Sequence, residues 1–82
     1  MRKIVELRNE GRLNFNGDVF FIDPERVDCF TIHEADPERL PDLQHICFYK
    51  DGRAIACATV YGRKRAEEYA LKVVNAQEGG RI

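Results

Sequence analysis

The pattern of apolar and polar positions is clearest between His45 and Gln77. Two alternating segments flank Lys50-Asp51-Gly52, which predicts a β-hairpin with a turn at the glycine. From Arg63 onward the apolar spacing becomes helical, with charged residues on the opposite side. The helix-side positions are Ala66, Tyr69, Ala70, Val73 and Val74. The pattern therefore predicts a hairpin that runs directly into an amphipathic helix, which ends at Gly79-Gly80.

Two loop lengths are possible at this turn, and they point the side chains of the second strand to opposite faces of the hairpin. A two-residue loop at Asp51-Gly52 would place Ile46 and Phe48 beside Ile55 and Cys57. A three-residue loop with Gly52 in a bulge sets Tyr49 opposite Arg53 and His45 opposite Cys57. It separates apolar from polar positions more cleanly, so we predict the three-residue loop. The face predicted to meet the helix carries Ile46, Phe48, Ala54, Ala56, Ala58 and Val60. The other face carries His45, Cys47, Tyr49, Arg53, Ile55, Cys57, Thr59 and Tyr61.

The alanines at 54, 56 and 58 suggest how the helix packs, because small side chains let a helix approach a sheet closely. Tyr69 and Val73 are expected to fill the space above them. The helix is therefore predicted to lie on its own hairpin.

The N-terminal half predicts three more strands. Residues 2–8 alternate, with Val5 and Leu7 on one side, and Asn16-Gly17 is a strong signal for a second hairpin. Residues 27–33 form the next strand, after a turn at Asp23-Pro24. Residues 34–42 are acidic and predicted to be exposed, with one helical turn opened by Pro37. A two-residue loop at Asn16-Gly17 puts four apolar residues on one face: Leu13, Phe15, Phe20 and Ile22. Val19 and Phe21 fall on the other.

These elements define an α+β fold. We predict a two-layer sandwich, β-β-β-β-β-α, in which a mostly antiparallel four- to five-stranded sheet carries one C-terminal helix on one face. Residues 1–78 are expected to form a single domain and residues 79–82 a flexible tail.

The composition excludes some classes of function. The 82 residues have a formal net charge of −1, which gives no overall attraction to nucleic acid or acidic membranes. Neither a membrane span nor a signal peptide is recognisable, and three cysteines without a paired framework fit reduced thiols, so we expect a cytoplasmic protein. The chain has no serine, which excludes serine-nucleophile chemistry. Enzymatic activity and a cofactor are not expected.

Histidine and cysteine residues offer one set of candidate ligands. Cys29 and His33 are four residues apart on one strand, about 13 Å along its axis, so one ion cannot bind both. His45, Cys47 and Cys57 share a face in the predicted register and could bind zinc. The competing interpretation treats the cysteines as small buried apolar residues, which free cysteines commonly are, and we favour it.

The most distinctive charged feature is the cluster Arg63, Lys64 and Arg65 in the first turn of the helix. Cations there oppose the helix dipole, so a bound anion is one interpretation. Nucleic-acid phosphate, an acidic patch on a partner, or residues 34–42 of a second copy could supply it. The alternative is a solvated turn, offset by Glu67 and Glu68. Nucleic acid bound there would be held weakly, with a steep dependence on salt.

The last candidate is the sheet face turned away from the helix, where an apolar and aromatic patch predicts an interface. The alternative is that the N-terminal strands cover this face. The residues predicted to bind a partner are Val19, Phe21, Tyr49, Arg53, Ile55 and Tyr61.

We therefore expect a small non-enzymatic protein-binding module, homodimeric, from a bacterium or a phage. By elimination it would be an accessory factor or an inhibitor of a larger macromolecular assembly, of the anti-defence or anti-CRISPR kind. The alternatives are a nucleic-acid-binding regulator that uses the basic helix start and a small zinc-binding protein.

Overall fold

The computed structural model describes residues 4–10 and 19–77. Within these ranges the chain forms five strands, a short 3₁₀ helix and one α-helix. In chain order they are β1 (Val5–Arg8), β2 (Val19–Ile22), η1 (Pro24–Arg26), β3 (Cys29–Asp36), β4 (Leu40–Lys50), β5 (Arg53–Tyr61) and α1 (Arg63–Ala76). The predicted α+β class is confirmed. The predicted turn at Asn16-Gly17, with Leu13 and Phe15, and the predicted tail at 79–82 lie outside the described residues.

The strands form two antiparallel sheets, and the prediction of a single four- to five-stranded sheet is wrong. One sheet is the pair β1–β2, and the other has the order β3-β4-β5. They meet at one corner, where the amide of Glu10 donates to the carbonyl oxygen of Thr59 at 2.7 Å. There the amide of Thr59 donates to the side-chain oxygen of Asn9 at 2.8 Å. Because the Asn9 side chain, and not a backbone carbonyl, accepts the hydrogen bond from Thr59, backbone pairing does not continue between β1 and β5 and the two sheets stay separate.

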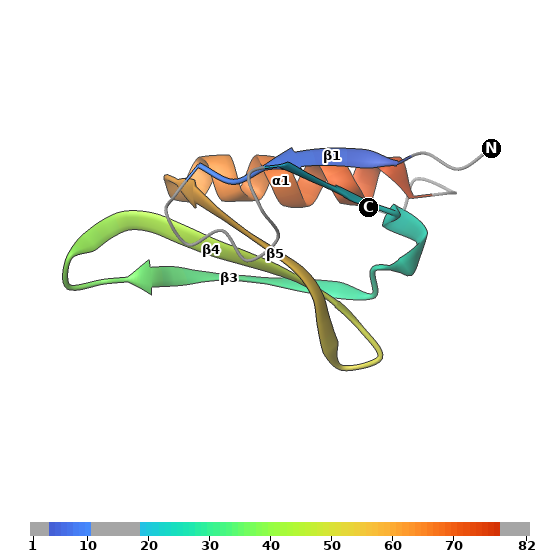
Figure 1. The fold of residues 1–82 in the computed structure, drawn as a ribbon, viewed down its shortest axis with the longest axis horizontal. Helices are drawn as coiled ribbons and strands as arrows, with labels where there is room; N and C mark the ends of the chain where they lie inside the picture. The colour runs from blue at the N-terminus through green and yellow to red at the C-terminus, as the bar shows by residue number, and fades with distance from the viewer. Residues whose placement is uncertain (1–3, 11–18, 78–82) are drawn as a thin grey trace.

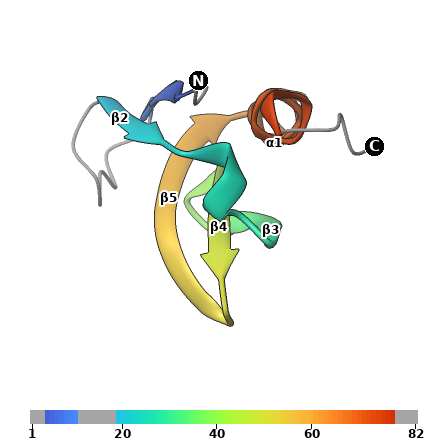
Figure 2. The same cartoon turned by 90° about the vertical axis from the view of Figure 1, so that its right-hand side faces the viewer.

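The helix and the β1–β2 hairpin lie side by side over the same face of the three-stranded sheet (Figures 1 and 2). Tyr69 of α1 donates its hydroxyl to the carbonyl oxygen of Arg8 at 2.6 Å, and Lys72 reaches the carbonyl oxygen of Glu6 at 3.3 Å. At the far end of the helix, the Gln77 side chain donates to two carbonyl oxygens in the 24–27 segment, each at 3.0 Å. The helix does lie on its hairpin as predicted, but it shares that face with the N-terminal strands.

The β4–β5 turn differs from the predicted one. Lys50 pairs with Arg53, so the loop has two residues, Asp51 (φ 53°) and Gly52 (φ 79°). Positive φ at both positions is the mark of a type I′ turn, which suits the twist of a hairpin. The predicted three-residue loop, with Tyr49 opposite Arg53, is wrong.

A β-bulge two residues into β5 nevertheless restores the predicted facing from Ala56 onward. The prediction that Ala54 meets the helix is wrong, because Ala54 precedes the bulge, pairs with Tyr49 and is exposed. Tyr49 pairs with Ala54, whereas Phe48 pairs with Ala56, so Ile55 is an extra residue in β5. One extra residue moves every later side chain of the strand to the opposite face. Ala56, Ala58 and Val60 therefore join Ile46 and Phe48 on the helix side, and all are buried. We call this the inner face and its opposite the outer face.

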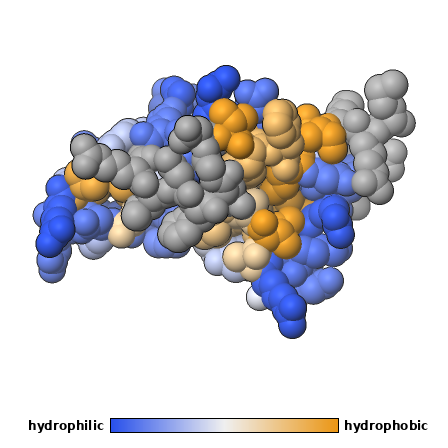
Figure 3. Space-filling view, in the orientation of Figure 1, coloured by the Kyte–Doolittle hydropathy of each residue, from blue (hydrophilic) through white to orange (hydrophobic). Residues whose placement is uncertain are grey.

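Residues 34–42 hold no helical turn. β3 continues to Asp36, β4 begins at Leu40, and Asp36 accepts a hydrogen bond from the amide of Arg39 at 3.2 Å across the turn between them. Both hairpin tips carry hydrophilic residues at the surface, at the left and lower ends of the molecule in Figure 3. The predicted exposure of this segment is confirmed for most of its residues, since only Ala35 and Asp36 are half-buried.

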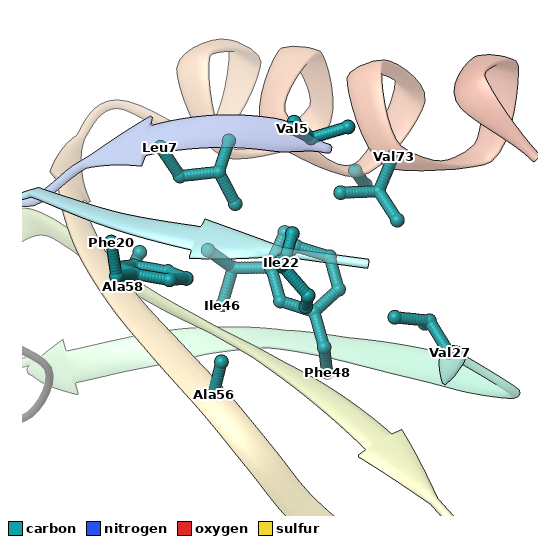
Figure 4. Close-up of a cluster of buried hydrophobic side chains, with 11 residues drawn as sticks. Val5, Leu7, Phe20, Ile22, Val27, Ile46, Phe48, Ala56, Ala58 and Val73 are labelled. Carbon is teal, nitrogen blue, oxygen red and sulfur yellow. The ribbon is translucent and has the colours of Figure 1, made fainter. Parts of the chain in front are cut away.

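The core lies between the sheet and its two coverings (Figure 4). Inner-face residues project up from the sheet, and side chains from β1, β2 and α1 project down onto them. The buried cluster comprises Val5, Leu7, Phe20, Ile22, Val27, Ile46, Phe48, Ala56, Ala58, Ala70 and Val73. Phe30 and Ile32 face the same side, because they pair with Phe48 and Ile46. At the edge strand, however, Phe30 stays 39% exposed.

No helix within residues 4–10 and 19–77 has the length and hydropathy of a membrane-spanning segment.

Candidate functional site

The outer face of the three-stranded sheet gathers histidine and cysteine from three neighbouring strands. His33 of β3 pairs with His45 of β4, and Cys47 of β4 pairs with Cys57 of β5. Alternation along β4 puts residues 45 and 47 on one face, and cross-strand partners share that face. The sequence prediction placed Cys57 opposite His45, and this is wrong, because the bulge at Ile55 moves Cys57 opposite Cys47.

The ligand atoms of His45, Cys47 and Cys57 all lie within 4.8 Å of one another. The Sγ atoms of Cys47 and Cys57 are 2.7 Å apart, and no disulfide joins them. Cys47 Sγ is 3.8 Å from Nε2 of His45 and 4.0 Å from its Nδ1. His45 Nδ1 also lies 3.2 Å from Nε2 of His33, with the two rings edge to face. The four side chains form a continuous chain of contacts across three strands.

Burial sets the protonation states in this cluster. Cys47 is buried, and the loss of solvent raises the pKa of its thiol to about 12, with a further contribution from the neighbouring Cys57. Burial also lowers the pKa of His45, and the charge that His33 can carry lowers it further. In the absence of a cation, the Cys47 thiol and the His45 imidazole are therefore both neutral at pH 7.

His33 is the residue that sequence reasoning excluded and the structure brings back. Its separation from Cys29 along β3 argued against one shared ion, and the continuous strand agrees with that argument. What the pattern did not show is that His33 lies directly across from His45. The signal that could have found it is a matching β3–β4 register, which pairs residues symmetrically about 38–39.

A second candidate site is an open groove of about 500 Å³ between the β2 strand and the β4–β5 turn. Three large apolar side chains there are well exposed: Ile4 at 53%, Phe21 at 67% and Ile55 at 42%. Figure 3 shows hydrophobic residues reaching the surface on this side of the molecule. The apolar groove, as we call it, is lined by Ile4, Phe20, Phe21, Ile22, Asp23, Arg26, Lys50, Ile55 and Ala56.

The structure brings together only part of the predicted partner-binding set. Phe21 and Ile55 line the apolar groove, where Ile4 joins them. Tyr49 is half-buried on the outer face, and its hydroxyl lies 3.4 Å from that of Thr31. The remaining three are spread over the molecule: Val19 at the start of β2, Arg53 at the β4–β5 turn and Tyr61 at the far end of β5. Ile4, which directly precedes β1, was not in the predicted set.

The basic cluster at the start of α1 is partly neutralised within the molecule. Arg63 forms an ion pair with Glu67 at 3.3 Å, and Arg65 forms one with Glu10. The nearby charge of Glu10 raises the pKa of Arg65. Gly62 caps the helix without a side-chain hydrogen bond, and its own amide donates to the carbonyl oxygen of Asp42 at 2.7 Å. Two of the three cations thus already have carboxylate partners in the described part of the chain.

Comparison with protein-family models, with curated proteins and with solved structures finds no match to this chain.

Proposed function

We propose that this chain is a small protein-binding module whose apolar groove accepts an apolar segment of another protein. The observation that carries the proposal is the convergence of Ile4, Phe21 and Ile55 on one groove. Single exposed apolar side chains are ordinary on protein surfaces, whereas a contiguous group of them marks an interface. Phe21 in particular has two thirds of its surface exposed and is the largest apolar side chain available for burial.

The charges at the edge of the groove select the occupant. Two cations, Arg26 and Lys50, and one carboxylate, Asp23, line it. Lys50 also lies 3.5 Å from Asp28, and Asp23 accepts a hydrogen bond from the amide of Glu25 at 3.0 Å. Arg26 is exposed, and no ion pair engages it within the described residues. A partner segment that places apolar side chains on Phe21 and Ile55 would gain from a carboxylate next to Arg26. We therefore commit to a partner segment that combines aromatic or aliphatic residues with aspartate or glutamate.

Peptide-display selection tests this occupant in vitro. Wild-type protein is expected to enrich peptides that combine apolar with acidic residues. The selected peptides should lose affinity by about 30-fold with Phe21→Asp, because truncating a central interface anchor costs about 2 kcal/mol or more. Leu71→Asp is the matched control, since Leu71 is 51% exposed on α1 and does not line the groove.

Retention of the same peptides by Phe21→Asp and Ile55→Asp would overturn the proposal. Sedimentation of the same variants identifies a different occupant, a second copy of the chain. If wild-type protein dimerises and Phe21→Asp is monomeric while Leu71→Asp still dimerises, the groove serves self-association and the acidic-segment proposal fails. The sequences of the selected peptides would point to a partner protein that contains a similar segment. If that partner belongs to a larger assembly, the chain would act as its inhibitor or accessory factor.

A further inference from the structure

Three donor atoms of the kinds that bind zinc converge on the outer face of the sheet. His45 and Cys47 are two apart on β4, and Cys57 is the direct partner of Cys47 on β5. All three side chains are buried or half-buried, and their donor atoms lie within 4.8 Å of one another. Imidazole nitrogen and thiolate sulfur are the usual zinc ligands in proteins. This convergence is separate from the apolar groove, which none of the three residues lines.

We propose that Nε2 of His45 and the Sγ atoms of Cys47 and Cys57 bind a thiophilic divalent cation, with zinc as the representative of that class. Two sulfurs and one nitrogen favour zinc over magnesium or calcium, which prefer oxygen. Three protein ligands leave one tetrahedral position for water or for a ligand from another molecule. Both thiols lose their protons on binding, so two protons are released for each zinc bound.

The distances fit this assignment after rotation of the cysteine side chains. Zinc–ligand bonds of about 2.3 Å to sulfur and 2.0–2.1 Å to nitrogen place tetrahedral sulfur and nitrogen ligands about 3.6 Å apart and two sulfurs about 3.8 Å apart. Cys47 Sγ is 3.8 Å from His45 Nε2 but also 4.0 Å from Nδ1, so it lies beside the ring, and the Cys47 side chain must rotate toward the lone pair of Nε2. The two sulfurs, at 2.7 Å, must separate by about 1 Å, which rotation about the Cα–Cβ bond of Cys57 or Cys47 can supply.

His33 completes the arrangement as a positioning residue. When Nε2 of His45 binds the cation, Nδ1 carries the proton and donates to Nε2 of His33 at the observed 3.2 Å. A hydrogen bond to the second ring nitrogen is how metal-binding histidines are usually held in one tautomer and orientation.

A disulfide between Cys47 and Cys57 is the competing chemistry, because the two sulfurs are neighbours. It would require an oxidant that accepts two electrons and two protons, and it would use neither histidine. Cation binding uses the whole cluster, so the observations favour it. The test separates the two outcomes.

The experiment uses the full chain, reduced with a phosphine and freed of metal with a chelator. Zinc is then titrated in competition with a chromophoric indicator, and cobalt is titrated separately to detect thiolate-to-metal charge transfer. We expect one zinc per chain with a dissociation constant below about 1 μM. Cys57→Ser and His45→Gln are expected to weaken zinc binding by at least about 100-fold, since each removes a ligand. His33→Gln should weaken it by about 10- to 100-fold and keep the 1:1 stoichiometry.

Cys29→Ser is the matched control, because Cys29 is exposed and lies outside the cluster. Circular dichroism of each metal-free variant establishes that it folds, and a zinc-induced rise in Tm should appear in wild type and Cys29→Ser but not in Cys57→Ser. The proposal is overturned if zinc binds more weakly than about 10 μM, if cobalt shows no thiolate charge transfer, or if Cys29→Ser loses as much affinity as Cys57→Ser. Ready formation of a Cys47–Cys57 disulfide in a chain that does not bind zinc would assign the pair to redox chemistry instead.

Discussion

The two faces of the β3-β4-β5 sheet are built from the same strands and differ in the chemistry of their side chains. On the inner face, β4 and β5 contribute Ile46, Phe48, Ala56, Ala58 and Val60, all of them apolar and at most 9% exposed. On the outer face, the residues between them are histidine, cysteine, threonine and tyrosine, with thiol and imidazole groups in contact. Alternation along a strand thus assigns packing to one side and chemistry to the other.

The difference depends on a single inserted residue. Without the bulge at Ile55, the two-residue turn would pair Phe48 with Ile55 and would turn Ala56, Ala58 and Val60 to the outer face. The bulge also places Ile55 in the apolar groove. One irregularity therefore aligns the core, brings Cys57 to Cys47 and supplies part of the proposed docking surface.

Phe48→Ala is the largest expected disruption of the inner face. Phe48 is fully buried in the core cluster, so its truncation should cost about 3–5 kcal/mol, from lost burial and the cavity that remains. Tyr49→Ala is the control: an aromatic residue is removed from the next position, which is half-buried on the outer face. Urea denaturation should show less than half the loss for Tyr49→Ala. Equal losses would mean that the two faces do not differ in packing.

Ala58→Leu tests the alanine positions under the coverings. Ala58 is fully buried, and three additional carbons there should cost about 1–3 kcal/mol through overpacking. Ala54→Leu adds the same atoms at an exposed position on the other side of the bulge, and should change the free energy of unfolding by less than about 0.5 kcal/mol. If thermal denaturation shows no loss of stability for Ala58→Leu, the helix and the N-terminal strands do not pack closely on Ala58.

Asp28 supplies the smallest effect, through the turn that sets the strand register. Its carboxylate accepts a hydrogen bond from the amide of Asp51 at 2.9 Å. This hydrogen bond, together with the charge of Lys50, lowers the pKa of Asp28 from its usual 3.8. A lowered pKa in the folded state stabilises the protein fully above pH 3.8, and the stabilisation is lost as the pH falls from that value through the lower pKa of the folded state. The Tm difference between wild type and Asp28→Asn should therefore be largest near pH 7 and shrink below pH 4. A Tm difference that does not change with pH would mean that the ionisation of Asp28 does not stabilise the fold.

The helix and the identity of the core were predictable because each depends on periodicity within one segment. Ala66, Ala70 and Val73 recur at helical spacing and are buried, and Val5 and Leu7 alternate and are buried. The facing of β4 and of β5 from Ala56 onward was also predicted correctly, although through the wrong loop. Ala54 was predicted on the inner face and lies on the outer one, because it precedes the bulge and pairs with Tyr49. The separation of apolar from polar positions determines which way the side chains point. A three-residue loop and a two-residue loop followed by a bulge both give that same facing beyond the bulge.

What could not be predicted depends on pairing between segments. The junction of the two sheets rests on hydrogen bonds of Asn9 and Glu10 to Thr59, which no local pattern encodes. The contact between His33 and His45 requires the β3–β4 register, and β4 itself begins at Leu40 within a stretch that looked like an acidic loop. The apolar groove needed the same information, since Ile4, Phe21 and Ile55 come from three separate segments.

Backbone NOEs across β4 and β5 test the central claim, the bulge at Ile55, most directly. We expect cross-strand contacts that link Cys47 with Cys57 and Phe48 with Ala56, and also Lys50 with Arg53 at the turn. Contacts that link Phe48 with Ile55 and Cys47 with Ala56 would contradict it, because the alanines and Cys57 would then exchange faces.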